Sequence, residues 1–153
     1  MRKFILIGFL LLNLSSAADT LKLGQYISPF KLANQHGKLI TVGNKAKIIF
    51  FTKEKTPSIL LNTFLASKDK KFLSNNEAFY IADISGMPFL VTKLIALPKM
   101  KKSPYDILLA KKEATLAFVP HKTGHITIIK QSEGKIESIA FVNKMSTLKN
   151  IFK

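Results

Sequence analysis

The feature that most constrains the fold is a short apolar segment that leads directly into a helix start. Residues 47–51 read KIIFF, and TKEKTPSILL follows them. An apolar run of this length is typical of a buried strand. Thr56 is a residue type that caps helices, and Pro57 is favoured at a first helical position, because the N–H that proline lacks has no partner there. A strand followed at once by a helix predicts an α/β fold.

The rest of the chain continues this alternation of strands and helices. Apolar segments at residues 78–82 and 126–130 predict two further strands, which we expect beside 47–51 at the centre of one sheet. The remaining predicted elements are an N-terminal hairpin over 29–42, a strand at 105–110, a hairpin over 126–142 turning through QSEG, and helices at 57–65, 88–97 and 145–152. The apolar run at 88–97 is too short to span a membrane, so we expect this helix to face the core. The order predicts a central mixed sheet flanked by helices.

The N-terminus has the pattern of a secretion signal. A basic start precedes an apolar run over residues 4–14, and small residues follow at 15–18. An uncleaved membrane anchor is the alternative, but a spanning helix needs roughly 20 apolar residues. The pattern therefore predicts a signal peptide over residues 1–17, with cleavage after Ala17 or Ala18.

The chain after the signal has no internal repeat and no linker rich in Gly, Ser or Pro. We therefore expect residues 18–153 to form a single domain of ordinary size. A cleaved signal implies a periplasmic or secreted protein with no transmembrane segment after cleavage.

The sequence contains no cysteine, and its formal net charge is +15 at pH 7. The absence of cysteine excludes disulfides, thiolate metal sites and thiol redox chemistry. The positive charge favours weak association with acidic partners or anionic membrane surfaces. Apart from Arg2, every basic residue is a lysine. Specific nucleic-acid recognition relies on arginine, so we expect no specific nucleic-acid partner.

A resemblance to a known family rests on the stretch GQYISPFKLANQHGK at residues 24–38. Its matching positions are Gly24, Pro29, Phe30, Leu32, Gly37 and Lys38. This stretch resembles the opening of peroxiredoxin-like and thiol-disulfide members of the thioredoxin superfamily. Within this group, the chain resembles cysteine-less secreted bacterial relatives. KIIFF is similar to their first central strand, Pro57 to the proline of their active-site helix, and residues 126–142 to their terminal hairpin. The resemblance implies a thioredoxin-like sandwich with an N-terminal β-hairpin.

The chain departs from this family where the family carries its chemistry. The redox dithiol would map onto Lys55 and Ser58, and the cis-proline that presents the substrate would map near Gly124 and His125. No thiol or proline stands at these positions. Thiol-disulfide exchange and thiol peroxidase activity are therefore excluded.

The start of the predicted helix is the candidate ligand site. A helix N-terminus exposes free N–H groups and a partial positive charge, and Lys53 and Lys55 directly precede it. Cations are disfavoured there unless an anion, or a carboxylate such as Glu54, completes the site. We expect Lys55 to supply charge and Thr56 and Ser58 to supply hydroxyl and backbone donors to an anion.

His121 and His125 are weak candidates for a metal site. Their i, i+4 spacing would bring both rings onto one side of a helix, but the KTG between them predicts a turn. We expect neither a metal nor another cofactor. The interpretation is an exported non-redox protein that acts as a binder rather than as an enzyme, and whose target is a partner protein or a small anionic ligand. The alternative is an enzyme, or an accessory of a redox system, that uses the same cleft without cysteine chemistry.

Overall fold

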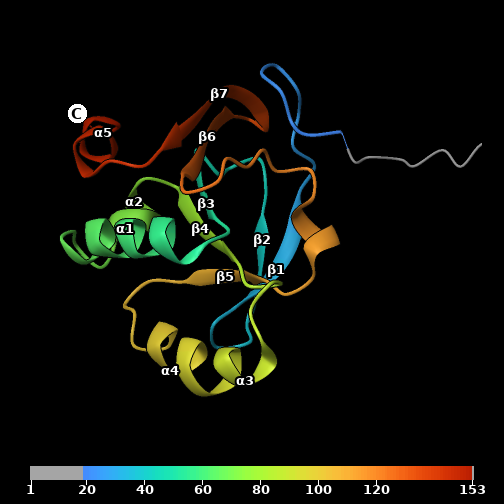
Figure 1. Cartoon of the computed structure of the whole chain (residues 1–153). Helices are drawn as coiled ribbons and strands as arrows, with labels where there is room; N and C mark the ends of the chain where they lie inside the picture. The colour runs from blue at the N-terminus through green and yellow to red at the C-terminus, as the bar shows by residue number, and fades with distance from the viewer. Residues whose placement is uncertain (1–18, 153) are drawn as a thin grey trace, which may run out of the picture.

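The computed structural model describes residues 19–152, and within this part of the chain seven strands form one mixed sheet (Figure 1). The strands are β1 (Phe30–Asn34), β2 (Leu39–Val42), β3 (Ile48–Thr52), β4 (Ala78–Asp83), β5 (Ile107–Ala110), β6 (Ile126–Ser132) and β7 (Lys135–Val142). Their order across the sheet is β2-β1-β5-β4-β3-β6-β7. Strands β3, β4 and β5 run parallel, and the other neighbouring pairs are antiparallel. The predicted mixed sheet and its N-terminal hairpin are confirmed.

Strand β3 lies at the centre of the fold, as its apolar sequence predicts. Phe50 pairs with Tyr80 of the parallel strand β4 on one side and with Ile128 of the antiparallel strand β6 on the other. Ile49 and Phe51 point to the opposite face from Phe50, and all three side chains are buried. Burial on both faces explains why this strand is a continuous apolar run and not an alternating one.

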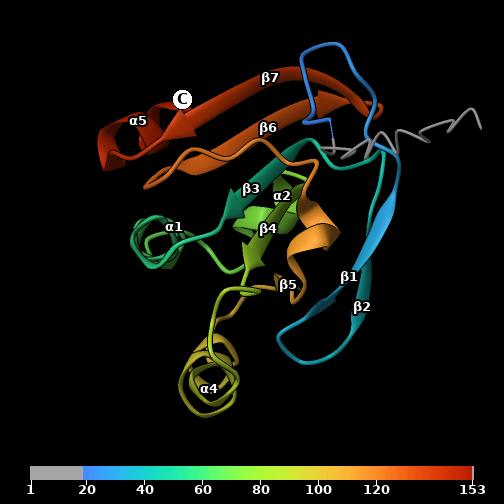
Figure 2. The ribbon, with the colours of Figure 1, turned by 45° about the vertical axis from the view of Figure 1, so that its right-hand side comes forward.

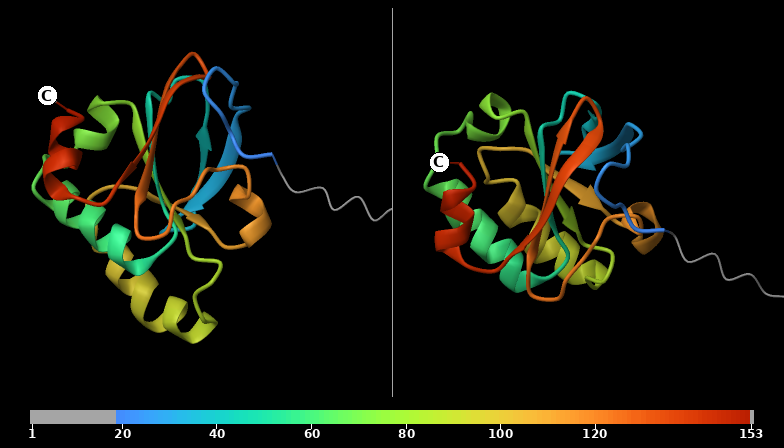
Figure 3. Two further views of the ribbon diagram at one scale, coloured as in Figure 1. Left: turned by 45° about the horizontal axis from the view of Figure 1, so that its top comes forward. Right: turned by 90° about the horizontal axis from the view of Figure 1, so that it is seen from above.

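All helices except η2 cover one face of the sheet. These helices are α1 (Lys55–Ala66), α2 (Phe72–Asn75), α3 (Phe89–Val91), the π segment η1 (Thr92–Ala96), α4 (Leu97–Met100) and α5 (Met145–Asn150). Figure 3 shows α1, α5 and the helix through α3 and α4 on the same side of the sheet. Leu61, Phe64 and Leu148 from this layer pack on Phe50 and Tyr80. The other face packs against the short 3₁₀ helix η2 (Glu113–Leu116) and the segment before β1.

The hairpin of β6 and β7 closes through two residues. Gln131 and Ser132 belong to β6, so the turn consists of Glu133 and Gly134 and is shorter than the predicted QSEG connection. Both turn residues have positive φ, 49° and 86°. Paired positive φ values define the turn that matches the twist of a two-residue hairpin, and glycine adopts them without strain.

The start of α1 differs from the prediction by two residues. The helix begins at Lys55 and the capping position is held by Glu54, whose side chain makes no capping hydrogen bond, so the prediction of Thr56 as the N-cap is wrong. Pro57 is the third helical residue, and its side chain is buried. Proline is tolerated there because the N–H groups of the whole first turn have no intrahelical partner, so the residue before proline need not be the cap.

Residues 89–100 form one continuous helix, which we call the α3–α4 helix. Pro98, which cannot donate a backbone hydrogen bond, lies inside this helix and does not end it. The π segment η1 ends at Ala96, two residues before this proline. The prediction that the apolar run faces the core is wrong. Leu97 and Met100 pack on the core. The five large apolar side chains nearer the start of the helix are exposed: Phe89, Leu90, Val91, Leu94 and Ile95.

The α3–α4 helix lies at the margin of the molecule, as Figure 2 shows for α4. None of the helices within residues 19–152 has the length and apolar character needed to cross a bilayer. The predicted signal peptide at residues 1–17 lies outside the described residues.

Candidate functional site

The carboxyl ends of the three parallel strands meet at one edge of the sheet, and this edge carries the predicted site. Helix α1 starts there after β3, and Asp83 ends β4 beside it. The loop over residues 120–125 returns to the same edge, because the antiparallel strand β6 begins there. In open α/β sheets the carboxyl edge is the usual place for ligands.

Glu54 connects the start of α1 to the loop before β6. Its Oε1 lies 3.1 Å from Nε2 of His121. Its Oε2 accepts a hydrogen bond from the backbone N–H of Gly124 at 2.5 Å. The side chains of Glu54 and His121 are 33% and 28% exposed, respectively, so both contacts of Glu54 are partly shielded from water. The sequence placed the counterpart of the family's cis-proline at Gly124 and His125, and in this chain a carboxylate binds that loop instead.

Lys53 forms ion pairs with two carboxylates of its own chain. Its Nζ lies 3.4 Å from Oε1 of Glu113 and 3.9 Å from Oδ2 of Asp83. The Asp83 side chain is only 4% exposed, and its Oδ1 also accepts a hydrogen bond from the N–H of Ser85. A buried carboxylate needs such partners. The positive charge of Lys53 therefore compensates the negative charge of Asp83 and does not serve to bind an external anion.

The three residues predicted to bind a ligand lie in different surroundings. Lys55 and Thr56 are exposed at the start of α1. The hydroxyl of Ser58 lies 2.8 Å from the carbonyl oxygen of Glu54 and 2.9 Å from Oγ1 of Thr52, and its N–H donates to the same carbonyl. The structure therefore brings Lys55 and Thr56 together at the surface and directs Ser58 inward.

A row of hydroxyl groups continues from Ser58 into the core. Oγ1 of Thr52, which contacts Ser58, lies 3.5 Å from the hydroxyl of Tyr80. In a separate contact, the hydroxyl of Tyr105 donates to Oδ1 of Asn62 at 3.0 Å. Burial raises the pKa of Tyr80, and burial also raises the pKa of Tyr105. The partners of Ser58 are a carbonyl oxygen and a neutral hydroxyl, neither of which acts as a general base for a nucleophile.

The two histidines do not converge. Both lie in the loop before β6 and outside any helix. Nδ1 of His125 lies 2.8 Å from the carbonyl oxygen of Thr123, whereas His121 contacts Glu54. Residues 19–152 contain no group of three His, Cys, Asp or Glu side chains arranged to hold a metal ion.

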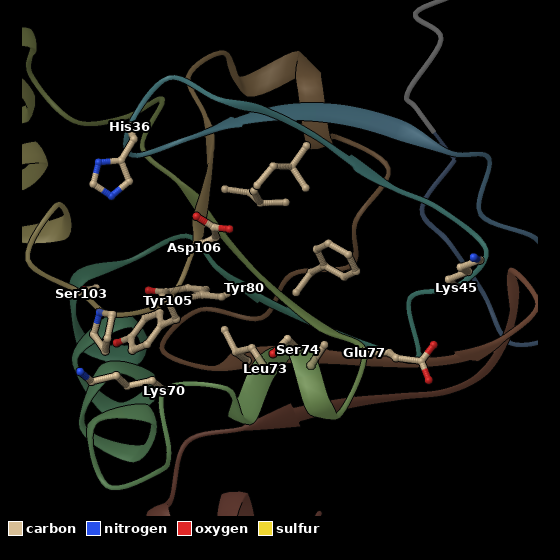
Figure 4. Close-up of a pocket in the computed structure, with 15 residues that line it drawn as sticks. His36, Lys45, Lys70, Leu73, Ser74, Glu77, Tyr80, Ser103, Tyr105 and Asp106 are labelled. Carbon is tan, nitrogen blue, oxygen red and sulfur yellow. The ribbon is translucent and has the colours of Figure 1, made fainter.

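A pocket of about 590 Å³ lies at the opposite edge of the sheet, near the amino ends of β4 and β5 (Figure 4). Its polar lining residues include His36, Lys45, Lys70, Glu77, Tyr105 and Asp106. The two carboxylates in this lining have partners in the chain. Glu77 forms an ion pair with Lys47, and Oδ1 of Asp106 accepts a hydrogen bond from the side-chain amide of Asn34 at 2.7 Å. Sequence reasoning missed this pocket because three segments that are far apart in the chain, within residues 36–45, 70–80 and 103–108, build its walls. It contains none of the predicted site residues.

No protein-family model matches the sequence, and no curated protein matches it. Solved structures do match. A protein from Bacteroides thetaiotaomicron, proposed to be a protein disulfide isomerase, has a TM-score of 0.57 at 15% identity, over 86% of this chain and 86% of that chain. The thioredoxin domain of a thiol-disulfide oxidoreductase from Bacteroides vulgatus has a TM-score of 0.52 at 16% identity, over 87% of this chain and 99% of that chain. The chain has a thioredoxin-like fold. A peroxidoxin from Mycobacterium tuberculosis is also similar in fold, with a TM-score of 0.52 at 15% identity, over 86% of this chain and 98% of that chain.

The likeness to these structures concerns the fold, and it confirms the thioredoxin-like resemblance found in the sequence. The names of these neighbours are those of redox proteins. In this thioredoxin-like chain, Lys55 and Ser58 stand where the family resemblance places the dithiol, and the sequence contains no cysteine.

Proposed function

We propose that this thioredoxin-like chain is an exported protein that acts by binding and not by thiol chemistry. The proposal rests on the composition and contacts of the junction between β3 and α1. This junction has no thiol, and the side chains of Glu54 and Ser58 in it form hydrogen bonds with their own chain. The target is a partner protein or a small anionic ligand. The predicted signal peptide over residues 1–17 favours a periplasmic or secreted location for the domain over 18–153.

We place the contact with the target at Lys55 and Thr56. Both are exposed on the first turn of α1, a helix of 12 residues. The N–H groups of a first helical turn lack intrahelical partners and carry partial positive charge, to which Lys55 adds a full charge. Ser58 supports this turn from inside through the Glu54 carbonyl. An anionic group of the target, such as a carboxylate, is the complementary chemistry.

The proposal is tested by charge reversal at Lys55. The protein and its Lys55→Glu variant are used to capture partners from the exported fraction of the native cell, and captured proteins are quantified by mass spectrometry. Charge-assisted contacts contribute roughly 1.5–3 kcal/mol, so we expect a loss of about tenfold or more. Lys135→Glu is the matched control, because Lys135 is exposed at the distant β6–β7 turn. Equal losses from both variants would show that only bulk charge matters and would exclude a specific contact at Lys55.

A further inference from the structure

The exposed apolar side chains of the α3–α4 helix form the most concentrated apolar surface of the described residues. Ten large apolar side chains are exposed within residues 19–152, and five of them lie on this helix. We call these five the apolar surface: Phe89, Leu90, Val91, Leu94 and Ile95. Phe89 is 72% exposed and Leu94 is 67% exposed. Single exposed apolar residues are ordinary, but such a cluster indicates a binding surface.

The charge around the apolar surface has one sign. Residues 84–105 contain no aspartate or glutamate, and the four charged residues among them are lysines: Lys93, Lys99, Lys101 and Lys102. Nζ of Lys93 lies 5.8 Å from the ring centre of Phe89, so this cation lies directly beside the apolar surface. Lys99 is exposed on α4, and Lys101 and Lys102 are exposed in the turn after it. The occupant of this surface must therefore combine apolar material with negative charge.

We propose that the α3–α4 helix is an interfacial anchor that binds the surface of an anionic lipid bilayer. A helix that exposes apolar side chains with lysines beside them and at its end can lie in the plane of a bilayer interface, with the apolar side chains among the acyl chains and the lysines at the headgroups. The long lysine stems reach the headgroups while their own methylenes cover apolar surface. Attraction to anionic lipid strengthens binding by roughly fivefold for each lysine near the surface.

A bilayer fits this surface better than a folded protein partner does. The residues that contribute most of the binding energy at protein interfaces are enriched in Tyr, Trp and Arg, and complementary charges of both signs fix the register of such interfaces. The α3–α4 helix has none of these three residue types and carries only positive charge. The chain as a whole has a formal charge of +15, which directs it towards anionic surfaces from a distance.

The anchor and the proposed contact at Lys55 are separate surfaces of one molecule. The α3–α4 helix follows β4, whose carboxyl end lies at the same edge of the sheet as the start of α1. Docking on a bilayer would hold this edge near the membrane. The membrane proposal does not depend on Lys55, and a failure of either test leaves the other proposal standing.

The absence of tryptophan in the chain allows a local fluorescence test. Phe89→Trp places a single fluorophore in the apolar surface. Phe141→Trp is the matched control on the edge strand β7, where the side chain is 40% exposed. With vesicles of phosphatidylcholine and phosphatidylglycerol at 3:1, we expect the emission of the Phe89→Trp protein to shift to shorter wavelength, and that of the control to stay unchanged. Pure phosphatidylcholine vesicles should leave both unchanged.

Co-sedimentation with the same vesicles measures the energetic contributions. We expect Leu90→Gln with Leu94→Gln to lower the partition coefficient roughly tenfold or more, because two apolar side chains lose their burial. We expect Lys101→Gln with Lys102→Gln to lower it by more than Lys22→Gln with Lys135→Gln, which removes the same charge elsewhere. All of these side chains are exposed, so the variants should retain the fold, which circular dichroism checks.

Several outcomes would overturn the membrane proposal. An unchanged Phe89→Trp spectrum with anionic vesicles would exclude insertion of the helix. Equal shifts with neutral vesicles, or equal losses from the two lysine pairs, would exclude recognition of anionic lipid by this helix. A shift of Phe89→Trp that grows with protein concentration in the absence of vesicles would assign the surface to a second copy of the chain.

Discussion

The imidazole of His121 lies 3.1 Å from the carboxylate of Glu54, and this contact joins the start of α1 to the loop before β6. The same carboxylate accepts a hydrogen bond from Gly124. In the family that the sequence resembles, these two segments carry the redox thiols and the substrate-presenting proline. Here they contact each other through a carboxylate, an imidazole and a backbone N–H, none of which can exchange a disulfide.

Removing the Glu54 carboxylate should destabilise the fold modestly. Glu54→Ala removes both the contact with His121 and the acceptor for the Gly124 N–H. Because the group is about one-third exposed, we expect a loss of about 1 kcal/mol in the free energy of unfolding, measured by urea denaturation. Glu137→Ala, at an exposed position on β7, is the control and should change stability by less than about 0.5 kcal/mol. A loss at Glu54 no larger than at Glu137 would mean that the contact contributes nothing.

Truncating Phe64 should strongly destabilise the protein. Phe64 lies on the buried side of α1, its side chain is fully buried, and its ring centre lies 5.7 Å from those of both Phe72 and Phe152. Phe64→Ala leaves a cavity among these rings, so we expect a loss of about 3–5 kcal/mol by urea denaturation. Ile59→Ala on the exposed side of the same helix should cost less than about 1 kcal/mol. Similar losses at the two positions would contradict the packing of α1 through Phe64.

Stability should fall at alkaline pH partly through Tyr80. Burial raises the pKa of Tyr80 in the folded protein, while the unfolded chain ionises near the ordinary pKa of about 10. The free energy of unfolding is therefore unaffected by this group below pH of about 10 and decreases as pH rises through the folded pKa. We expect Tyr80→Phe to flatten this decrease by up to about 1.4 kcal/mol per pH unit.

The measurement for Tyr80 is urea denaturation of both proteins between pH 8 and 11. The titration of lysines is common to the two and cancels in the comparison. Tyr105→Phe should flatten the decrease less, because Tyr105 is only half-buried. Parallel stability curves for the wild type and Tyr80→Phe would show that Tyr80 ionises equally in both states.

The purified protein should not accelerate the reduction of insulin disulfides by dithiothreitol. The chain contains no cysteine, and disulfide exchange requires a thiolate as the attacking group. The rate of turbidity development, with a dithiol thioredoxin as the positive control, checks this prediction. Activity that persists through rigorous purification would refute it.

The exported form of the protein should lack the N-terminal signal. Intact-mass analysis of protein from the exported fraction is expected to give a chain beginning after Ala17 or Ala18, as the small residues at 15–18 predict. A full-length product held in the membrane fraction would contradict both cleavage and the periplasmic or secreted location.

Much of the fold could be predicted because its signals are local. The apolar run KIIFF, the glycine at position 134 and the alternation of strands with helices specify a mixed sheet through residues that are close in sequence. The helix start was less predictable. Thr56 is a preferred capping residue, whereas Glu54, which holds the capping position, is not, and Pro57 fits any place in the first turn, so the local pattern misplaced the boundary by two residues.

The sequence predicted where the candidate residues lie in the fold, but it did not predict their contacts. Lys55 and Thr56 are exposed at the start of α1, as their position next to a helix start suggests. The contact between Glu54 and His121 joins segments far apart in the chain, and a single sequence carries no signal for such a pairing. Only the antiparallel placement of β6 beside β3 brings the two together.

The sequence by itself determined that this protein has no thiol chemistry, because reactivity of that kind requires an atom that the chain lacks. It also determined a mixed sheet flanked by helices, because strand patterns and turn residues are properties of short segments, and the resemblance to the thioredoxin superfamily implied the thioredoxin-like form of this sheet. The tertiary structure alone decided that the apolar residues of the α3–α4 helix face solvent. Hydropathy gives the free energy that a side chain would gain on burial, but whether another element covers it depends on how the whole chain packs.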